Sequence, residues 1–214
     1  MTNLTLAVGR PVLADRIFSR RIATDLVLIA AGAGLTSIAA QLSIPLWPVP
    51  ITGQTFAVLL VGTVLGSARG ALSMALYLAL GLLGLPVFTN GAHGSLFALP
   101  SGGFIVGFIF AAGLVGWLAQ REWDHRVLRT VVSFAVGTVV IYAFGLPWLY
   151  AVISNYSDAT LSQFFGTTNL TQATLTGGLY PFVLGDLLKA VIAGVALPLT
   201  WKLVHRADNS VDNG

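Results

Sequence analysis

The sequence predicts an all-α integral membrane protein with six transmembrane helices. Of its 214 residues, 56% are hydrophobic and only 9% are charged, and the mean hydropathy is +0.84. The apolar residues form long Leu/Ala/Val/Gly blocks without a two-residue alternation, a pattern that favours helices over the tilted strands of an outer-membrane barrel. Such a chain is expected to form one compact membrane domain rather than a soluble domain with an anchor.

Six apolar segments are predicted to cross the bilayer. They are residues 25–42, 52–65, 70–85, 102–119, 128–153 and 179–204. The second and third are short for a complete span and are expected to tilt little or to thin the bilayer. Merging them would place Arg69 in mid-membrane, so we keep them separate. The chain then divides into an N-terminal tail (1–24), a membrane domain (25–204) and a C-terminal tail (205–214).

Six spans place both termini on one side of the membrane, and the basic residues segregate to that side. The ten residues are Arg10, Arg16, Arg20, Arg21, Arg69, Arg121, Arg126, Arg129, Lys202 and Arg206, while the opposite loops hold no Lys or Arg. The positive-inside rule therefore predicts that both termini are cytoplasmic. The first 25 residues lack the pattern of a cleaved signal peptide, which predicts a retained N-terminus, either folded or disordered.

Three loops on the predicted outer side have unusual compositions. The first, residues 44–54, contains three prolines, which prevent a regular helix. The second spans 86–101, and the third, residues 154–178, is long, polar and rich in threonine. Loops of that length are usually functional or disordered, and the aromatic residues Phe164 and Phe165 favour a lid.

Lys189 is the one basic residue that cannot be placed at a membrane face. It lies roughly 15 Å below the predicted outer end of the last helix, which is near the centre of the bilayer. Asp186 is its i, i+3 neighbour and so shares its helix face. A charged residue at this depth usually marks a ligand or ion site, although a neutralising pair that only locks the bundle is the alternative.

A buried carboxylate beside an ammonium suits a small polar ligand, because the carboxylate accepts N–H groups and the ammonium attracts carbonyl or carboxylate oxygens. Catalysis has little support, since the chain has no Ser-His-Asp order, zinc-protease pattern or phosphate-binding loop. His93, His125 and His205 lie far apart in the sequence, so no metal site is expected. The absence of cysteine excludes disulfides and thiol chemistry. The net charge of +3 is spread over the loops and does not indicate nucleic-acid binding.

Small residues recur at four-residue spacing and indicate close helix contacts. Gly62, Gly66 and Gly70 form one such run, for which packing within the chain is the simpler interpretation. On the first span the pattern is made by Ala30, Ala33, Gly34 and Ser37. That face either packs within the bundle or contacts another membrane protein.

Three stretches of the chain resemble the BioY family, the substrate-binding membrane subunits of energy-coupling-factor biotin transporters. They are Pro-Val-Pro-Ile-Thr-Gly-Gln-Thr (48–55), Gly-Leu-Leu-Gly-Leu-Pro-Val-Phe (81–88) continuing to Ser-Gly-Gly-Phe (101–104), and Pro-Phe-Val-Leu-Gly-Asp-Leu-Leu-Lys (181–189). Their order and spacing cover residues 44–195. The resemblance implies six helices around an outward-facing vitamin pocket, with the three unusual loops as its cap.

The resemblance also implies a ligand site. Asp186 would accept a ureido N–H of biotin, and Lys189 would pair with Asp186 and donate to the ligand's carbonyl oxygen. Asn90 would complete the polar ring, Phe88 and Phe104 would contact the thiophane ring, and Gln54 would line the entrance. The chain departs from the family pattern in residues 98–104, and it has His93 near the position of a family arginine. We therefore expect His93 or loop N–H groups to contact the ligand's carboxylate.

The resemblance further implies high-affinity biotin uptake across the cytoplasmic membrane, with no cofactor. The expected partners are a transmembrane coupling subunit, held at the face of Ala30, Ala33, Gly34 and Ser37, and two cytosolic ATPases that carry out all ATP chemistry. A different vitamin in the same fold, a membrane-embedded enzyme with Lys189 as base, and a purely structural membrane protein are the alternatives.

Overall fold

The computed structural model describes residue 6 and residues 10–212, with residues 205–212 described by their backbone alone. Residues 1–5 and 7–9 of the predicted N-terminal tail and residues 213–214 of the C-terminal tail lie outside this part. The side chains of His205 and Arg206 lie outside it as well. Every structural statement below concerns the described residues.

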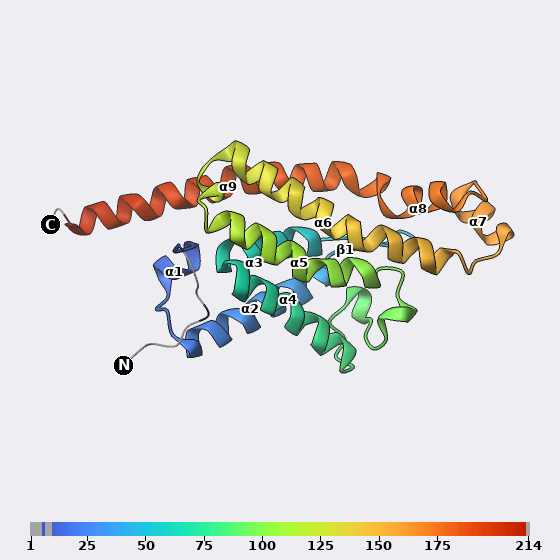
Figure 1. Ribbon diagram of the computed structural model, residues 1–214, viewed down its shortest axis with the longest axis horizontal. Helices are drawn as coiled ribbons and strands as arrows, with labels where there is room; N and C mark the ends of the chain where they lie inside the picture. The colour runs from blue at the N-terminus through green and yellow to red at the C-terminus, as the bar shows by residue number, and fades with distance from the viewer. Residues whose placement is uncertain (1–5, 7–9, 213–214) are drawn as a thin grey trace.

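Six long apolar helices form the bundle (Figure 1). They are α2 (Ile22–Gln41), α3 (Gln54–Leu65), α4 (Ser67–Leu82), α5 (Gly102–Ala119), α6 (Val127–Ile153) and α9 (Tyr180–Asp212). Each begins and ends within three residues of a predicted span, except that α9 continues to Asp212. By length and composition α2, α5, α6 and the continuous segment Leu170–Val204 can cross a membrane, whereas α3 and α4 are shorter apolar helices.

Helix α5 lies at the centre of the bundle and packs against α3, α4 and α6. Helix α2 covers α3 and α4, and α9 packs mainly against α6. Both chain ends lie at the left end of the molecule in Figure 1, while α7, α8 and the loop that follows α4 lie at the right end. The second and third predicted loops therefore lie at the end of the bundle away from α1 (Leu13–Ile17).

The third predicted loop is largely helical. It contains α7 (Asp158–Phe165) and α8 (Leu170–Gly178). The side chain of Ser157 caps α7 by accepting the N–H of Thr160, and that of Asn169 caps α8 by accepting the N–H of Gln172. Two polar residues of this stretch, Ser157 and Asn169, are thus capping residues of short helices.

Short elements complete the connections. The strands β1 (Ser43–Ile44) and β2 (Ile51–Thr52) pair antiparallel and close the proline-rich first loop at its base. One-turn helices η1 (Thr89–Gly91) and η2 (Leu96–Ala98) lie in the second loop, and η3 (Trp123–His125) joins α5 to α6. The N-terminal segment contains α1 (Leu13–Ile17), which packs against α3.

Glycines bring α5 against the turn between α3 and α4. A Cβ atom on Gly116 would lie 2.4 Å from the carbonyl carbon of Gly66 and 2.7 Å from the carbonyl oxygen of Gly62. Gly66 also has a φ of +85°, a left-handed conformation that glycine adopts without strain. The Gly62–Gly66 run therefore serves packing within the chain, as its simpler interpretation predicted.

Arg69 is buried at the end of the bundle that holds the termini, with 2% of its side chain exposed. Its Nη2 lies 2.6 Å from Asp15 Oδ1 and its Nε lies 2.8 Å from Asp25 Oδ1. Burial alone raises the pKa of the Asp15 carboxyl, but hydrogen bonds from Arg20, from the backbone N–H of Val12 and from Arg69 outweigh it, so that the pKa lies below its ordinary value. The predicted N-terminal tail is thus bound to the bundle from Val12 onward by charge as well as by packing.

Gly116→Val should lower the stability of the purified protein in detergent by about 3 kcal/mol, because the added side chain meets backbone atoms that cannot move aside. Gly34→Val is the matched control, since a Cβ atom there meets nothing within 4 Å. Thermal unfolding of the two variants checks this expectation. Equal melting temperatures would contradict the close approach of α5 to the α3–α4 turn.

Asp15→Asn should destabilise the protein at pH 7 by about 2 kcal/mol, because Arg69 loses one of its charged partners. A carboxyl with a lowered pKa stabilises the fold above its unfolded pKa, near 3.8, and this contribution is lost as the pH falls further. The difference in melting temperature from wild type should therefore shrink below about pH 4. Glu122→Gln, which removes the exposed ion pair with Arg10, is the control. A difference that stays constant with pH would indicate that Asp15 acts through packing alone.

Candidate ligand-binding site

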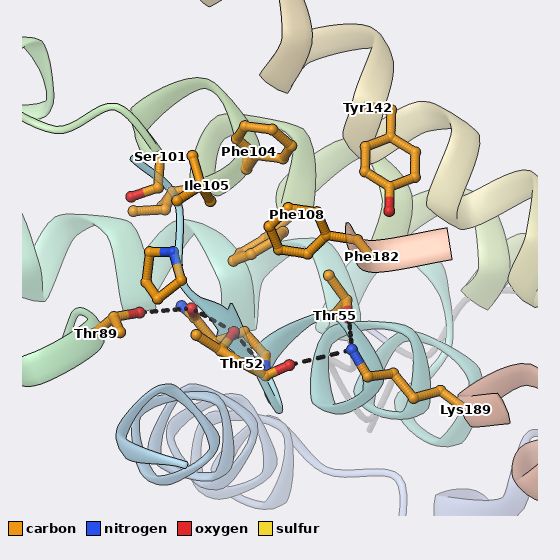
Figure 2. Close-up of a pocket in the computed structure, with 13 residues that line it drawn as sticks. Thr52, Thr55, Thr89, Ser101, Phe104, Ile105, Phe108, Tyr142, Phe182 and Lys189 are labelled. Carbon is orange, nitrogen blue, oxygen red and sulfur yellow. Dashed lines mark hydrogen bonds between the residues drawn. The ribbon is translucent and has the colours of Figure 1, made fainter. Parts of the chain in front are cut away.

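A cavity lies between the proline-rich loop and the helices α3, α5, α6 and α9 (Figure 2). About 40 Å³ of it is open to a water-sized molecule, so a larger ligand can enter only if the lining side chains move apart. The residues that line it are Val49, Pro50, Thr52, Gln54, Thr55, Thr89, Ser101, Phe104, Ile105, Phe108, Tyr142, Phe182 and Lys189.

Lys189 reaches from α9 to the first turn of α3. Its Nζ donates to the backbone carbonyl of Thr52 at 3.1 Å, to Thr55 Oγ1 at 2.7 Å and to Asp186 Oδ1 at 3.1 Å. The three acceptors match the three hydrogens of an ammonium group. Protein groups therefore take the place of water around the Lys189 ammonium, and 21% of the side chain is exposed.

Asp186 lies directly behind the cavity wall. Its Oδ1 accepts hydrogen bonds from Lys189 and from Thr55 Oγ1, and its Oδ2 accepts one from the hydroxyl of Tyr142. These donors come from α9, α3 and α6, so the carboxylate joins three helices at one point. The predicted pairing of Asp186 with Lys189 on one helix face is confirmed.

Gln54 forms a second polar corner of the cavity. Its side-chain N–H donates to the hydroxyl of Tyr77 at 2.6 Å, and its amide oxygen accepts from Thr52 Oγ1 at 3.0 Å and Thr89 Oγ1 at 2.9 Å. Three hydroxyl groups therefore hold the Gln54 side chain in place, and each can donate or accept as the amide requires. Thr89 brings the second loop into the same network.

The remaining walls are apolar and largely aromatic. Phe104 and Phe108 come from α5 and Phe182 from α9, as Figure 2 shows. The rings of Phe104 and Tyr142 meet edge to face, with centroids 6.2 Å apart. A cavity with one charged, hydrogen-bonding end and aromatic sides suits a compact ligand that has a polar head and an apolar body.

The structure brings only some of the predicted site residues together. Lys189, Gln54 and Phe104 line the cavity, and Asp186 hydrogen-bonds to three of the lining residues. The other three predicted residues, Phe88, Asn90 and His93, do not line the cavity.

Phe88 is buried behind the cavity wall. Its ring packs edge to face on Tyr77, and Gly81 provides the space, because a Cβ atom there would lie 2.0 Å from the ring. Its present position supports the second loop rather than a ligand.

Asn90 and His93 are exposed in the second loop. Asn90 has a φ of +58°, and its Oδ1 accepts a hydrogen bond from Ser43 Oγ. The imidazole Nδ1 of His93 lies 3.0 Å from the carbonyl oxygen of Gly91. Neither residue lines the cavity in this conformation.

Sequence reasoning did not single out Thr55 and Tyr142, although both contact Asp186. A signal for Thr55 was its place in the polar run Thr-Gly-Gln-Thr (52–55) at the start of an apolar segment. A signal for Tyr142 was its hydroxyl in the middle of an apolar span, where a polar group needs a partner.

An aromatic cluster joins the first and third loops at the outer side of the cavity. Trp47 stacks on Tyr156, with centroids 5.6 Å apart, and also contacts Phe164 and Phe165 of α7. Trp47 is close in sequence to Val49 and Pro50, which line the cavity. The contact therefore connects α7 to the cavity wall.

The small-residue face predicted on α2 is only partly accessible. Ala30 is exposed, and Gly34 and Ser37 are partly exposed. Ala33 is buried within the chain, with 1% exposure. Three of the four residues can therefore meet a partner in this conformation.

Apolar helices around a polar-ended cavity define an integral membrane protein with an internal site for a small molecule. The BioY family profile matches residues 8–206, and the chain belongs to the BioY family.

Relatives from distant organisms agree with this assignment. The chain is 36% identical over 182 residues to a biotin transporter BioY of Rhizobium etli, covering 80% of this chain and 89% of the relative. It is 36% identical over 183 residues to a biotin transporter BioY of Thermotoga maritima, covering 84% of this chain and 98% of the relative. A crystal structure of the S-component for biotin from an ECF-type ABC transporter superposes with a TM-score of 0.68 at 25% identity, covering 84% of this chain and 92% of that one.

Thr55→Val should destabilise the purified protein by about 2 kcal/mol, because Lys189 and Asp186 each lose a hydrogen-bond partner in a buried setting. Thr55→Ser keeps the hydroxyl and is the matched control, which we expect to cost less than about 1 kcal/mol. Thermal unfolding in detergent measures both. If the two variants unfold at the same temperature, the hydroxyl does not support the charged pair.

Proposed function

We propose that this chain is the biotin-binding subunit of an energy-coupling-factor transporter and takes part in high-affinity biotin uptake. The observation that carries the proposal is the Asp186–Lys189 pair, held by three helices at the end of an aromatic cavity in a BioY-family chain. The relatives named as biotin transporters supply the ligand.

The chemistry of biotin fits the two ends of the cavity. Its ureido group carries two N–H donors and one carbonyl oxygen, which complement the carboxylate of Asp186 and the ammonium of Lys189. Its thiophane ring is apolar and compact, which suits the wall that contains Phe104.

The valerate chain of biotin would point toward the outer loops. Gln54 and Thr89 line the cavity on that side and are the proposed polar contacts at the entrance. His93 or loop N–H groups remain the proposed partners of the carboxylate, and Asn90 the proposed member of the polar ring. Both exposed side chains would need the second loop to move inward on binding.

The proposed topology has six transmembrane helices, with both termini in the cytoplasm and the cavity facing outward. Its support is the position of both termini at one end of the bundle (Figure 1), together with the ten basic residues predicted for that side. The two shorter helices α3 and α4 would cross a locally thinned bilayer. The membrane is then the cytoplasmic membrane.

The proposed partners are a transmembrane coupling subunit and two cytosolic ATPases. The chain's similarity to an S-component of an ECF-type ABC transporter supports this assembly. The accessible small residues Ala30, Gly34 and Ser37 form the proposed contact for the coupling subunit, because small side chains let helices approach closely. The chain itself acts as a transporter subunit, without a cofactor, and biotin is its cargo.

Biotin should bind the purified protein in detergent with one-to-one stoichiometry by calorimetry. Asp186→Asn and Lys189→Met should each weaken binding by about 100-fold or more, because each removes a charge-assisted hydrogen bond to the ligand. Lys202→Met is the matched control, since Lys202 is the other lysine of the chain and is exposed on the same helix.

The alternatives give different results in the same experiment. Absence of binding heat in a well-folded wild type would reject biotin, and a screen of other vitamins would then test whether only the ligand was wrong. Chemical turnover of a bound compound would indicate an enzyme. Unchanged affinity in both Asp186→Asn and Lys189→Met would move the site away from α9.

A further inference from the structure

The segment that contains α1 covers the end of the bundle opposite the ligand cavity. Val12, Leu13 and Ala14 are all buried, and the side chain of Val12 lies against the turn at Gly66. Figure 1 shows α1 beside the ends of α2 and α3, at the end of the molecule that holds the termini. The outward face of this segment therefore has a fixed position relative to the bundle.

The acidic residues of this segment are turned inward. Asp15 and Asp25 expose only 4% and 1% of their side chains, and both pair with Arg69. They are the only acidic residues between positions 10 and 25. Any exposed charge on this stretch is therefore positive.

The outward face combines cations with large apolar side chains. Ile17, Phe18 and Ile22 are 66%, 49% and 45% exposed. Arg16 and Arg21 are exposed beside them, and Arg20 exposes 34% of its side chain. Apolar residues interleaved with arginines are typical of segments that lie in a membrane interface, where the apolar groups enter the acyl region and the cations remain among the headgroups.

Two neighbouring features place this face at the level of the membrane surface. Trp117, in the last turns of α5, is 43% exposed, and the guanidinium of Arg121 lies 3.7 Å from the centre of its ring. Tryptophan and arginine together are typical of a membrane–water boundary. On α2 the apolar surface continues from Ile22 to the exposed Leu26 and Val27, which favours lipid over a soluble protein as the occupant.

We propose that residues 16–22, the anchor surface, bind an anionic phospholipid surface. Ile17, Phe18 and Ile22 insert below the headgroups, while Arg16 and Arg21 contact the lipid phosphates. The anionic leaflet attracts clustered cations, whereas a zwitterionic leaflet satisfies only the apolar side chains. The inference rests on the proposed function for its orientation, in which this end faces the cytoplasmic leaflet.

The chain has no cysteine, so Ser19→Cys provides a single labelling site within the anchor surface, at an exposed position. A small environment-sensitive dye on this residue is followed in nanodiscs of phosphatidylcholine and phosphatidylglycerol in equal parts. Bromine, which quenches the dye on contact, is carried by one lipid or the other. We expect at least twofold stronger quenching by brominated phosphatidylglycerol than by brominated phosphatidylcholine.

The matched variant carries Arg16→Gln and Arg21→Gln on the same labelled chain. Its ratio of quenching by brominated phosphatidylglycerol to quenching by brominated phosphatidylcholine should fall toward one. Thr168→Cys, exposed between α7 and α8 at the other end of the molecule, is the control for the dye and should show no preference between the lipids. Melting temperatures of the labelled chains exclude unfolding as the cause of any change.

Three results would overturn the proposal. The dye could remain in water and unquenched by either lipid, or be quenched equally by both lipids in the wild-type background. The dye could also be shielded from water only when partner subunits are added. The last would identify a protein contact instead. Biotin binding is measured in the same nanodiscs. Intact biotin binding without a lipid preference rejects the anchor surface alone, whereas a lipid preference without biotin binding rejects the proposed function alone.

Discussion

The ammonium group of Lys189 is the constraint around which the cavity end of the structure is organised. A charge inside an apolar bundle is stable only when protein groups replace its water. Here the replacement comes from Thr52, Thr55 and Asp186, and Tyr142 then satisfies the remaining carboxylate oxygen. One buried charge thus fixes the start of α3, the middle of α6 and the first turns of α9 relative to one another, and these elements line the cavity.

The opposite end of the bundle holds a second buried cation, which is also balanced by protein groups. Arg69 is buried and is neutralised by Asp15 and Asp25. Between the two charged ends, the contacts of α5 with α3 and α4 depend on glycines such as Gly62 and Gly116. The bundle is therefore held by ionic contacts near its ends and by close backbone packing between them, since burial of apolar surface offers little drive between helices in lipid.

The sequence predicted those features that depend on local composition. Apolar length located the helices to within a few residues, and the i, i+3 spacing placed Asp186 and Lys189 on one face. It did not reveal Tyr142 or Thr55, because their roles depend on helices that are distant in sequence. The composition of the stretch between α6 and α9 predicts a loop, because the residue types that cap helices, such as Ser157 and Asn169, are also common in loops. The sequence also does not reveal that the ring of Phe88 occupies the space left by Gly81.

The junction between α8 and α9 has a mechanical consequence. Only one residue, Leu179, leaves helical geometry between the two helices, so α8 is a nearly direct extension of the helix that carries Asp186 and Lys189. Gly177 on α8 packs against Phe165, which belongs to the aromatic cluster, and against Pro48, which follows Trp47 in the chain. The aromatic cluster is therefore mechanically connected, through α8, to the helix that carries the charged pair.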